Sequence, residues 1–249
     1  MNNNQNYSIG SWITLGHFSI AEIMADVGFD WLCVDMEHSV IDYYMAEQLI
    51  ATIEAHGCIP YVRVGANDPT IIKRVLDAGA RGVIVPMITT KEDAQMAVGA
   101  VKYPPDGNRG VGLARAQGYG FNFEEYAATV NDEIILIVQI EHVNAINNLE
   151  DILNVDGIDG TIIGPYDLSG SMGKPGRYDD NDVREVLKTY EKISNKMNKP
   201  MGYHVIKPDF RLVQEKIQAG YIFIAFSLDT LFLGTICRDQ ITQLKKSLP

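Results

Sequence analysis

The segment "DWLCVDMEHSVID" (30–42) joins a short apolar run to a cluster of titratable side chains. Residues 31–34 are all apolar, which is typical of a strand that is buried on both faces. Asp35, Glu37 and His38 follow immediately. The segment therefore predicts a buried strand whose carboxyl end opens onto a functional surface.

Seven other short apolar runs resemble residues 31–34, and longer amphipathic stretches separate them. The predicted strands are 11–16, 30–36, 59–65, 81–87, 134–141, 160–164, 199–205 and 221–227. The predicted helices are 20–27, 43–55, 69–78, 91–101, 143–153, 182–195, 209–219 and 228–246. Asp68 before Pro69 is a helix start signal, and Gly57 and Gly79 are stop signals. Apolar strands that alternate with helices indicate a parallel sheet.

Eight strand–helix units in a chain of 249 residues predict an α/β fold, the (β/α)₈ TIM barrel, for which about 250 residues is typical. No linker or shift in composition divides the chain, so we expect a single barrel domain over 1–249, with 1–8 as a frayed lead-in. The stretch 103–128 is long and rich in Gly and Pro. We expect it to be a functional loop, with an ordinary surface excursion as the alternative.

Composition narrows the class of partner. A formal net charge of −11 argues against binding to nucleic acid or to an anionic membrane, because both require a positive surface. The three cysteines form no CxxC pair, which favours neither a disulfide framework nor a cysteine metal site. The N-terminus lacks a signal pattern, and no apolar run approaches the roughly 20 residues of a membrane span. We therefore expect a cytoplasmic protein.

Polar residues recur where the predicted strands end. They are Asp35, His38, Arg63, Gln139, Glu141 and Asp167. Each has a simpler explanation when taken alone: Asp35 could be a solvated carboxylate, Arg63 a structural ion-pair partner, and the last two helix caps. Isolated charges at the ends of apolar strands would each cost desolvation energy, so a shared site at the barrel mouth explains them together.

Two carboxylates on consecutive strands, Glu141 and Asp167, suit a hard cation that prefers oxygen ligands, such as Mg²⁺ or Mn²⁺. Two protein ligands leave coordination positions open. A 2-oxo acid could fill those positions with its carbonyl and carboxylate oxygens, and the cation could then act as a Lewis acid on a developing enolate. The pattern thus favours enolate chemistry, and no lysine stands at a strand end to form an imine instead.

Several long segments resemble the HpcH/HpaI aldolases, metal-dependent class II pyruvate aldolases of the phosphoenolpyruvate/pyruvate-binding barrel superfamily. They are "GFDWLCVDMEHSVID" (28–42), "VRVGANDPTIIKRVLDAGARGVIVPMITTKEDA" (62–94), "YPPDGNRGVG" (103–112), "VQIEHVNAINNL" (138–149) and "GIDGTIIGPYDLSGSMGKPG" (157–176). The resemblance implies reversible cleavage of a 4-hydroxy-2-oxo acid into pyruvate and an aldehyde through a metal-bound pyruvate enolate.

The resemblance also implies roles for single residues. Glu141 and Asp167 would bind the divalent cation, with Mg²⁺ or Mn²⁺ favoured over Co²⁺ or Zn²⁺. Arg63 would contact the keto oxygen, and His38, held by Asp35, would be the acid/base group. The predicted substrate-binding residues are Gln139, the backbone of Gly164, Pro165 and Tyr166, Asp77 from a neighbouring subunit, and Trp12. Trp12 could equally be a core aromatic residue.

Assembly and substrate are less constrained. The resemblance implies a homohexamer, a trimer of dimers that exchange the last helix, although the apolar segment 228–237 could also pack on its own barrel. His17, His142 and Tyr166 depart from the usual family pattern, and His204 ends the seventh predicted strand. These residues bear on the aldehyde, which the sequence leaves open. The alternative functions are an oxaloacetate-type decarboxylase or another carbon–carbon bond enzyme at the same site, and a non-catalytic barrel that binds a small acid.

Overall fold

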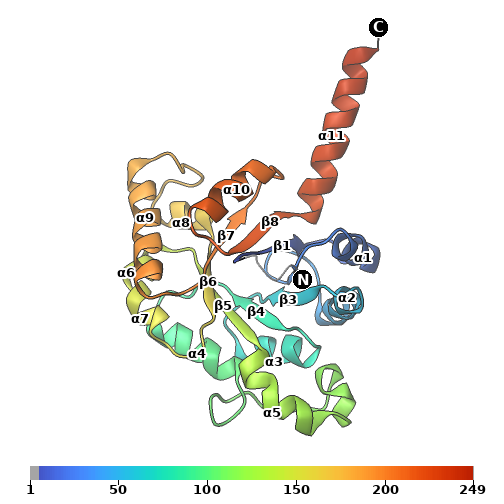
Figure 1. Ribbon diagram of the computed structural model, residues 1–249, viewed down its shortest axis with the longest axis vertical. Coiled ribbons are helices and arrows are strands. Elements are labelled where there is room, and N and C mark those ends of the chain that lie inside the picture. The colour runs from blue at the N-terminus through green and yellow to red at the C-terminus, as the bar shows by residue number, and fades with distance from the viewer. Residues whose placement is uncertain (1–5, 249) are drawn as a thin grey trace.

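The computed structural model describes residues 6–248, and the chain forms a closed barrel of eight parallel strands (Figure 1). The strands are β1 (Ser8–Ile13), β2 (Trp31–Asp35), β3 (Ile59–Arg63), β4 (Gly82–Val85), β5 (Ile135–Ile140), β6 (Gly160–Ile163), β7 (Met201–Val205) and β8 (Phe223–Leu228). Each strand pairs with the next one in the sequence, and β8 pairs with β1 to close the barrel. The predicted (β/α)₈ TIM barrel is therefore confirmed.

The first strand begins earlier than predicted. The backbone N–H of Ser8 donates to the Ile222 carbonyl (2.7 Å), and that of Ile9 donates to the Asp30 carboxylate (2.7 Å). These bonds place Ser8 in β1, so the prediction of 1–8 as a frayed lead-in is wrong for Ser8. Residues 1–5 of that predicted lead-in lie outside the described residues.

Helices surround the barrel (Figure 1). They are α1 (Phe18–Asp26), α2 (Tyr43–Ala55), α3 (Pro69–Asp77), α4 (Lys91–Val101), the 3₁₀ helix η1 (Arg115–Gly120), α5 (Phe123–Glu133), α6 (Val143–Asn147), α7 (Leu149–Leu153), α8 (Pro165–Ser171), α9 (Asn181–Lys196), α10 (Phe210–Gln218) and α11 (Asp229–Ser247). The predicted helix 143–153 is divided at Asn148, whose side-chain amide donates to the Thr89 carbonyl (2.9 Å).

Side-chain caps fix where several helices begin. The Asp42 carboxylate accepts from Met45 N (2.9 Å), the Asp68 carboxylate accepts from Thr70 N (2.7 Å), and the Thr90 hydroxyl accepts from Asp93 N (3.1 Å). Each cap satisfies a backbone N–H that has no partner within the helix and contributes about 1 kcal/mol. These caps explain why the starts of α2, α3 and α4 were readable in the sequence.

The inside of the barrel has a closed aromatic end. The indole of Trp31 stacks on Phe223 with ring centroids 4.3 Å apart and 7° between the planes, and Tyr61 packs against both rings. We call these three residues the aromatic floor. A Cβ at Gly10 would lie 2.0 Å from the Trp31 ring, so only glycine leaves room at that position.

Closure of the barrel is reinforced just beyond β8. The buried Asp229 carboxylate accepts from Thr14 N (2.8 Å), Leu15 N (2.7 Å) and the Thr14 hydroxyl (2.6 Å). These bonds join the start of α11 to the loop that follows β1. The first and last strands of the barrel are thus connected by a side chain as well as by their backbones.

The connection 103–128 is ordered and contains η1 and the start of α5. The Asn131 side chain on α5 accepts from Tyr103 N (2.7 Å) and donates to the Tyr103 carbonyl (2.9 Å). The Arg109 guanidinium lies over the Tyr103 ring, 4.7 Å from its centroid. These contacts hold the connection against α5, and none of its residues lines the cavity at the barrel mouth.

Helix α11 projects away from the barrel (Figure 1). Asp229 is its one buried residue, while Leu233, Ile236, Ile241 and Leu244 are exposed. Among residues 6–248, no helix has both the length and the apolarity to cross a membrane.

Candidate active site

A cavity of about 150 Å³ opens at the carboxyl ends of the strands. The residues that line it are Trp12, His38, Arg63, Gln139, Ile162, Ile163, Gly164, Pro165, Tyr166, Asp167, His204 and Ile206. Most of the predicted site residues are in this set, because side chains at this end of a TIM barrel point into one mouth. Asp35 and Glu141 are not in the lining set but contact residues that are. Asp77 neither lines the cavity nor makes such a contact.

Arg63 at the end of β3 is held by two carboxylates from the end of β2. Its Nε and Nη2 donate to the two oxygens of Asp35 at 3.0 and 2.6 Å, and its Nη1 lies 3.2 Å from Glu37 Oε2. Burial tends to lower the pKa of Arg63, but the bonds and charge of Asp35 outweigh it and raise the pKa. The guanidinium is therefore a fixed positive charge at the mouth.

His38 reaches the cavity from the loop after β2, and its imidazole is 64% exposed. The Asp35 carboxylate accepts from the backbone N–H of His38 (3.2 Å). The imidazole itself lies closest to a different carboxylate, with Nε2 3.6 Å from Glu37 Oε2. The predicted contact therefore differs in the structure: Asp35 holds the His38 backbone while both oxygens of Asp35 bind Arg63, and Glu37 faces the imidazole.

Glu37 was not among the predicted site residues, although it lies between Asp35 and His38. Burial raises the pKa of Glu37, and the charge of Arg63 partly opposes this shift. The signal in the sequence was its position at the end of a buried strand.

Glu141 sits just past the end of β5 and is almost fully buried. Its Oε1 accepts from Met87 N (2.8 Å), and its Oε2 accepts from the Gln139 amide. Met87 has a φ of 53°, a left-handed conformation that is strained for a side chain of this kind. Burial raises the pKa of Glu141, while the Met87 N–H opposes that shift.

Asp167 approaches the same region from the first turn of α8 and lines the cavity. Gln139 Oε1 is buried without a hydrogen-bond partner, and a Cβ at Gly164 would lie 3.1 Å from Glu141 Oε2. Two carboxylates and an unpartnered amide oxygen form an oxygen-donor set that fits a hard divalent cation. Within residues 6–248 no group of three or more His, Cys, Asp or Glu is placed to hold a metal ion, so solvent or substrate oxygens would complete the coordination.

Asp77 lies at the end of α3, away from the mouth. Its carboxylate accepts from Arg109 Nη2 (2.7 Å), and the Arg109 side chain is fully buried. Its predicted contact with substrate in a neighbouring subunit thus involves a carboxylate that is already paired within its own chain.

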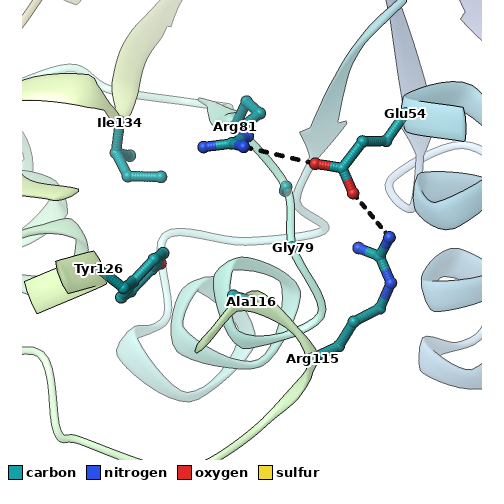
Figure 2. Close-up of a pocket in the computed structure, with 8 residues that line it drawn as sticks. Glu54, Gly79, Arg81, Arg115, Ala116, Tyr126 and Ile134 are labelled. Carbon is teal, nitrogen blue, oxygen red and sulfur yellow. Dashed lines mark hydrogen bonds and ion pairs between the residues drawn. The ribbon is translucent and has the colours of Figure 1, made fainter. Parts of the chain in front are cut away.

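A second cavity, of about 120 Å³, lies at the opposite end of the barrel, where β4 and β5 begin. Its Glu54 carboxylate lies between two guanidinium groups, 2.6 Å from Arg115 Nη2 and 3.5 Å from Arg81 Nη2 (Figure 2). None of the predicted site residues lines this cavity. The chemistry predicted from the sequence is therefore concentrated at the mouth.

Known proteins resemble this chain along nearly its whole length. The model of the family described as HpcH/HpaI aldolase/citrate lyase matches residues 8–233. A 2-keto-3-deoxy-L-rhamnonate aldolase of Escherichia coli is 36% identical over 242 residues, covering 95% of this chain and 88% of the relative. A hydroxypyruvate/pyruvate aldolase of Roseobacter denitrificans is 38% identical over 227 residues, covering 90% and 87%.

Solved structures agree with this likeness. An HpcH/HpaI aldolase/citrate lyase family protein from Burkholderia cenocepacia has a TM-score of 0.91 and 32% identity, covering 97% of this chain and 96% of that one. The citrate synthase SbnG has a TM-score of 0.84 and 27% identity, covering 98% and 94%.

Proposed function

Because the chain belongs to the HpcH/HpaI aldolase/citrate lyase family, we propose that it is a pyruvate aldolase, which reversibly cleaves a 4-hydroxy-2-oxo acid into pyruvate and an aldehyde. One observation carries the proposal. A fixed guanidinium, an exposed imidazole and an oxygen-donor set converge on a single cavity at the barrel mouth. These are the groups needed to stabilise an enolate and to move a proton.

Glu141 and Asp167 are the residues that would hold a divalent cation, with Gln139 Oε1 beside them. When bound, such a cation would supply positive charge to the oxygens of the 2-oxo acid. Mg²⁺ and Mn²⁺ fit the carboxylate and amide donors best. Gly164 has no side chain where the chain passes Glu141, so the backbone of residues 164–167 can come close to a bound carboxylate.

Arg63 would orient the substrate and stabilise negative charge on the keto oxygen. The two bonds from Asp35 hold the guanidinium before substrate arrives, so little reorganisation is needed during the reaction. Glu37 on the other side of the guanidinium restricts its position further. The charge is thus placed by the ends of two neighbouring strands, β2 and β3.

His38 would move the proton in the carbon–carbon bond step. In cleavage it removes the proton of the C4 hydroxyl, and the O–H electron pair becomes the second bond of the aldehyde carbonyl. The C3–C4 bond breaks and leaves its electrons on C3. Protonation of C3 then gives the methyl group of pyruvate. Glu37, 3.6 Å from the imidazole, would stabilise the imidazolium formed in the first step.

Proton NMR of pyruvate in D₂O tests the proposal directly. Protein treated with a chelator and then resupplied with Mg²⁺ or Mn²⁺ should replace the methyl protons with deuterium, and the chelated protein should not. Exchange without any added cation would overturn the cation assignment. Absence of exchange in both samples would count against enolate formation from pyruvate.

A second candidate is condensation or decarboxylation at the same site with a dicarboxylic 2-oxo acid. The likeness to a citrate synthase structure at 27% identity favours it. Incubation with oxaloacetate and Mg²⁺ separates the two: rapid formation of pyruvate and CO₂ without an aldehyde would support a decarboxylase. A non-catalytic barrel would show neither this reaction nor exchange.

We also propose that α11 packs on a second copy of the chain, within a homohexamer built as a trimer of dimers. The support is the exposed apolar residues on α11, which its own barrel leaves uncovered. Light scattering should give a mass near six times 27.6 kDa for the native protein. Ile236→Lys should lower that mass, because Ile236 is 63% exposed on α11. Any contact of Asp77 with substrate would then belong to a neighbouring copy.

A further inference from the structure

Two polar atoms at the mouth have no hydrogen-bond partner. They are Nε1 of Trp12 on β1 and Nε2 of His204 on β7, and both are buried. The two rings meet edge to face, with centroids 5.5 Å apart, and both residues line the cavity. A buried polar atom without a partner is costly, so this pair is a place where a ligand group would be stabilised.

The hydrogen-bonding character of the pair follows from the ring chemistry. An indole N–H can only donate. The imidazole of His204 is neutral near pH 7, because burial and the charge of Arg63 lower its pKa to about 4. The backbone of Ser227 partly opposes that shift, and Nε2 has no hydrogen-bond partner, so the neutral ring can present Nε2 as an acceptor. The pair therefore offers one donor and one acceptor.

A hydroxyl group matches such a pair, because its hydrogen can be donated to His204 while its oxygen accepts from Trp12. The position of the pair relates it to the reaction. The Arg63 guanidinium lies over the Trp12 indole, 4.4 Å from the ring centroid. A group held by Trp12 would therefore lie near the Arg63 guanidinium, which would contact the keto oxygen.

We propose that Trp12 and His204 form a hydroxyl subsite. It selects 4-hydroxy-2-oxo acids that carry a further hydroxyl on C3 or on C5, the carbon next to C4. The inference rests on the proposed aldolase function. Such a hydroxyl can belong to the 2-oxo acid, as in hydroxypyruvate, or to the aldehyde, as in glycolaldehyde. The chemistry is the same in both cases, and the kinetic comparison below separates them.

The test measures kcat/KM for four substrate pairs: pyruvate or hydroxypyruvate combined with acetaldehyde or glycolaldehyde, all with Mg²⁺ or Mn²⁺. The quantity compared is the ratio of kcat/KM for the hydroxylated substrate to kcat/KM for the substrate without that hydroxyl. It is taken separately for the 2-oxo acids and for the aldehydes, the two arms of the test. In His204→Leu and Trp12→Phe that ratio should fall about tenfold relative to the native protein, because a hydrogen bond to a substrate hydroxyl is lost. The arm in which it falls identifies the source of the hydroxyl.

Two further variants make the result specific. His204→Gln keeps an amide near the position of Nε2 and should restore part of the ratio. Tyr203→Phe is the matched control, because Tyr203 is the neighbouring residue on β7 and packs outward against Tyr221 and Lys216. Its ratio should equal that of the native protein. Thermal unfolding of each variant identifies any that fail to fold, in which case the remaining variants decide.

The proposal is overturned if His204→Leu and Trp12→Phe change all four rates by the same factor, since that result means a structural role only. Failure of the underlying function looks different. If the native protein converts none of the four pairs and shows no exchange of pyruvate protons, the aldolase proposal is wrong, and the subsite falls with it.

Discussion

The two ends of the barrel interior differ in the side chains that fill them: one end is aromatic and the other is polar. The aromatic floor is filled by the stacked rings of Trp31 and Phe223 and the tilted ring of Tyr61, with Gly10 making room for Trp31. The mouth instead contains buried polar atoms without hydrogen-bond partners: Trp12 Nε1, Gln139 Oε1 and His204 Nε2. At the floor, Trp31 Nε1 is the one such atom.

The floor therefore contributes mainly to the stability of the fold, and the mouth carries the groups for chemistry. Packed rings lower the free energy of the folded state without regard to any ligand. Unpartnered polar groups raise it, and they persist where a bound molecule satisfies them. Substitutions at the floor should therefore affect folding first, and substitutions at the mouth should affect catalysis first.

The largest effect is expected at the mouth. Glu141→Gln removes the buried carboxylate of the cation site and should lower kcat/KM for aldol cleavage on the order of 1,000-fold, with weaker binding of Mn²⁺ in a direct titration. Glu133→Gln is the control, because Glu133 is an exposed carboxylate at the far end of the barrel. Full activity of Glu141→Gln would remove Glu141 from the site.

At the floor, Gly10→Ala should destabilise the fold by about 3 kcal/mol, since the new Cβ would overlap the Trp31 ring. For a chain of this size the midpoint of thermal unfolding should fall by about 6–12 °C. Gly170→Ala is the matched control, because no atom lies within 4 Å of a Cβ at that position. A midpoint that is unchanged in Gly10→Ala would mean that the floor repacks freely.

Arg63→Lys should lower kcat by about 100-fold while the protein stays folded. A lysine cannot make the two parallel bonds to Asp35, so its charge is no longer fixed in position. Circular dichroism checks the fold, and the same kinetic assay gives kcat. If the variant instead unfolds with native activity per folded molecule, Arg63 is structural and the mouth resembles the floor.

The smallest effect concerns pH. His204 has a pKa of about 4 in the folded protein and about 6.5 when unfolded. Between these values the unfolded chain binds a proton that the folded chain does not, so the free energy of unfolding decreases as the pH falls from about 6.5 to 4. Because the ring is partly accessible, we expect His204 to account for about 2 kcal/mol of this decrease in the free energy of unfolding. His204→Gln should lack that part of the decrease. Denaturant titrations at pH 7 and pH 4.5 measure it, and equal losses in both proteins would contradict the shift.

The strands and most helices could be predicted from the sequence because each carries its own local signal. The apolar runs predicted the strands, and Asp68 predicted a helix start that its cap confirms. Two helices carried no clear local signal. The helix α5 was missed because Gly and Pro dominate the segment before it, and α8 was missed because it has seven residues.

The candidate site was predicted as a set of residues rather than as a network. The barrel geometry brings strand ends together, so Arg63, Gln139 and Asp167 could be grouped from their positions alone. The partners of each side chain could not. Both oxygens of Asp35 bind Arg63, and Glu37 faces the His38 imidazole. These contacts depend on side-chain directions, which the spacing of residues in a sequence does not encode.

The bonds from Asp229 to residues 14 and 15 have a consequence for synthesis on the ribosome. β1 is among the first segments made, yet one of its edges waits for β8 and for Asp229, 215 residues later than Thr14. At about 5–20 residues per second the delay is roughly 10–40 s. Throughout that time the N–H and C=O groups on this edge of β1 have no strand to pair with, which leaves the edge open to pairing with another chain.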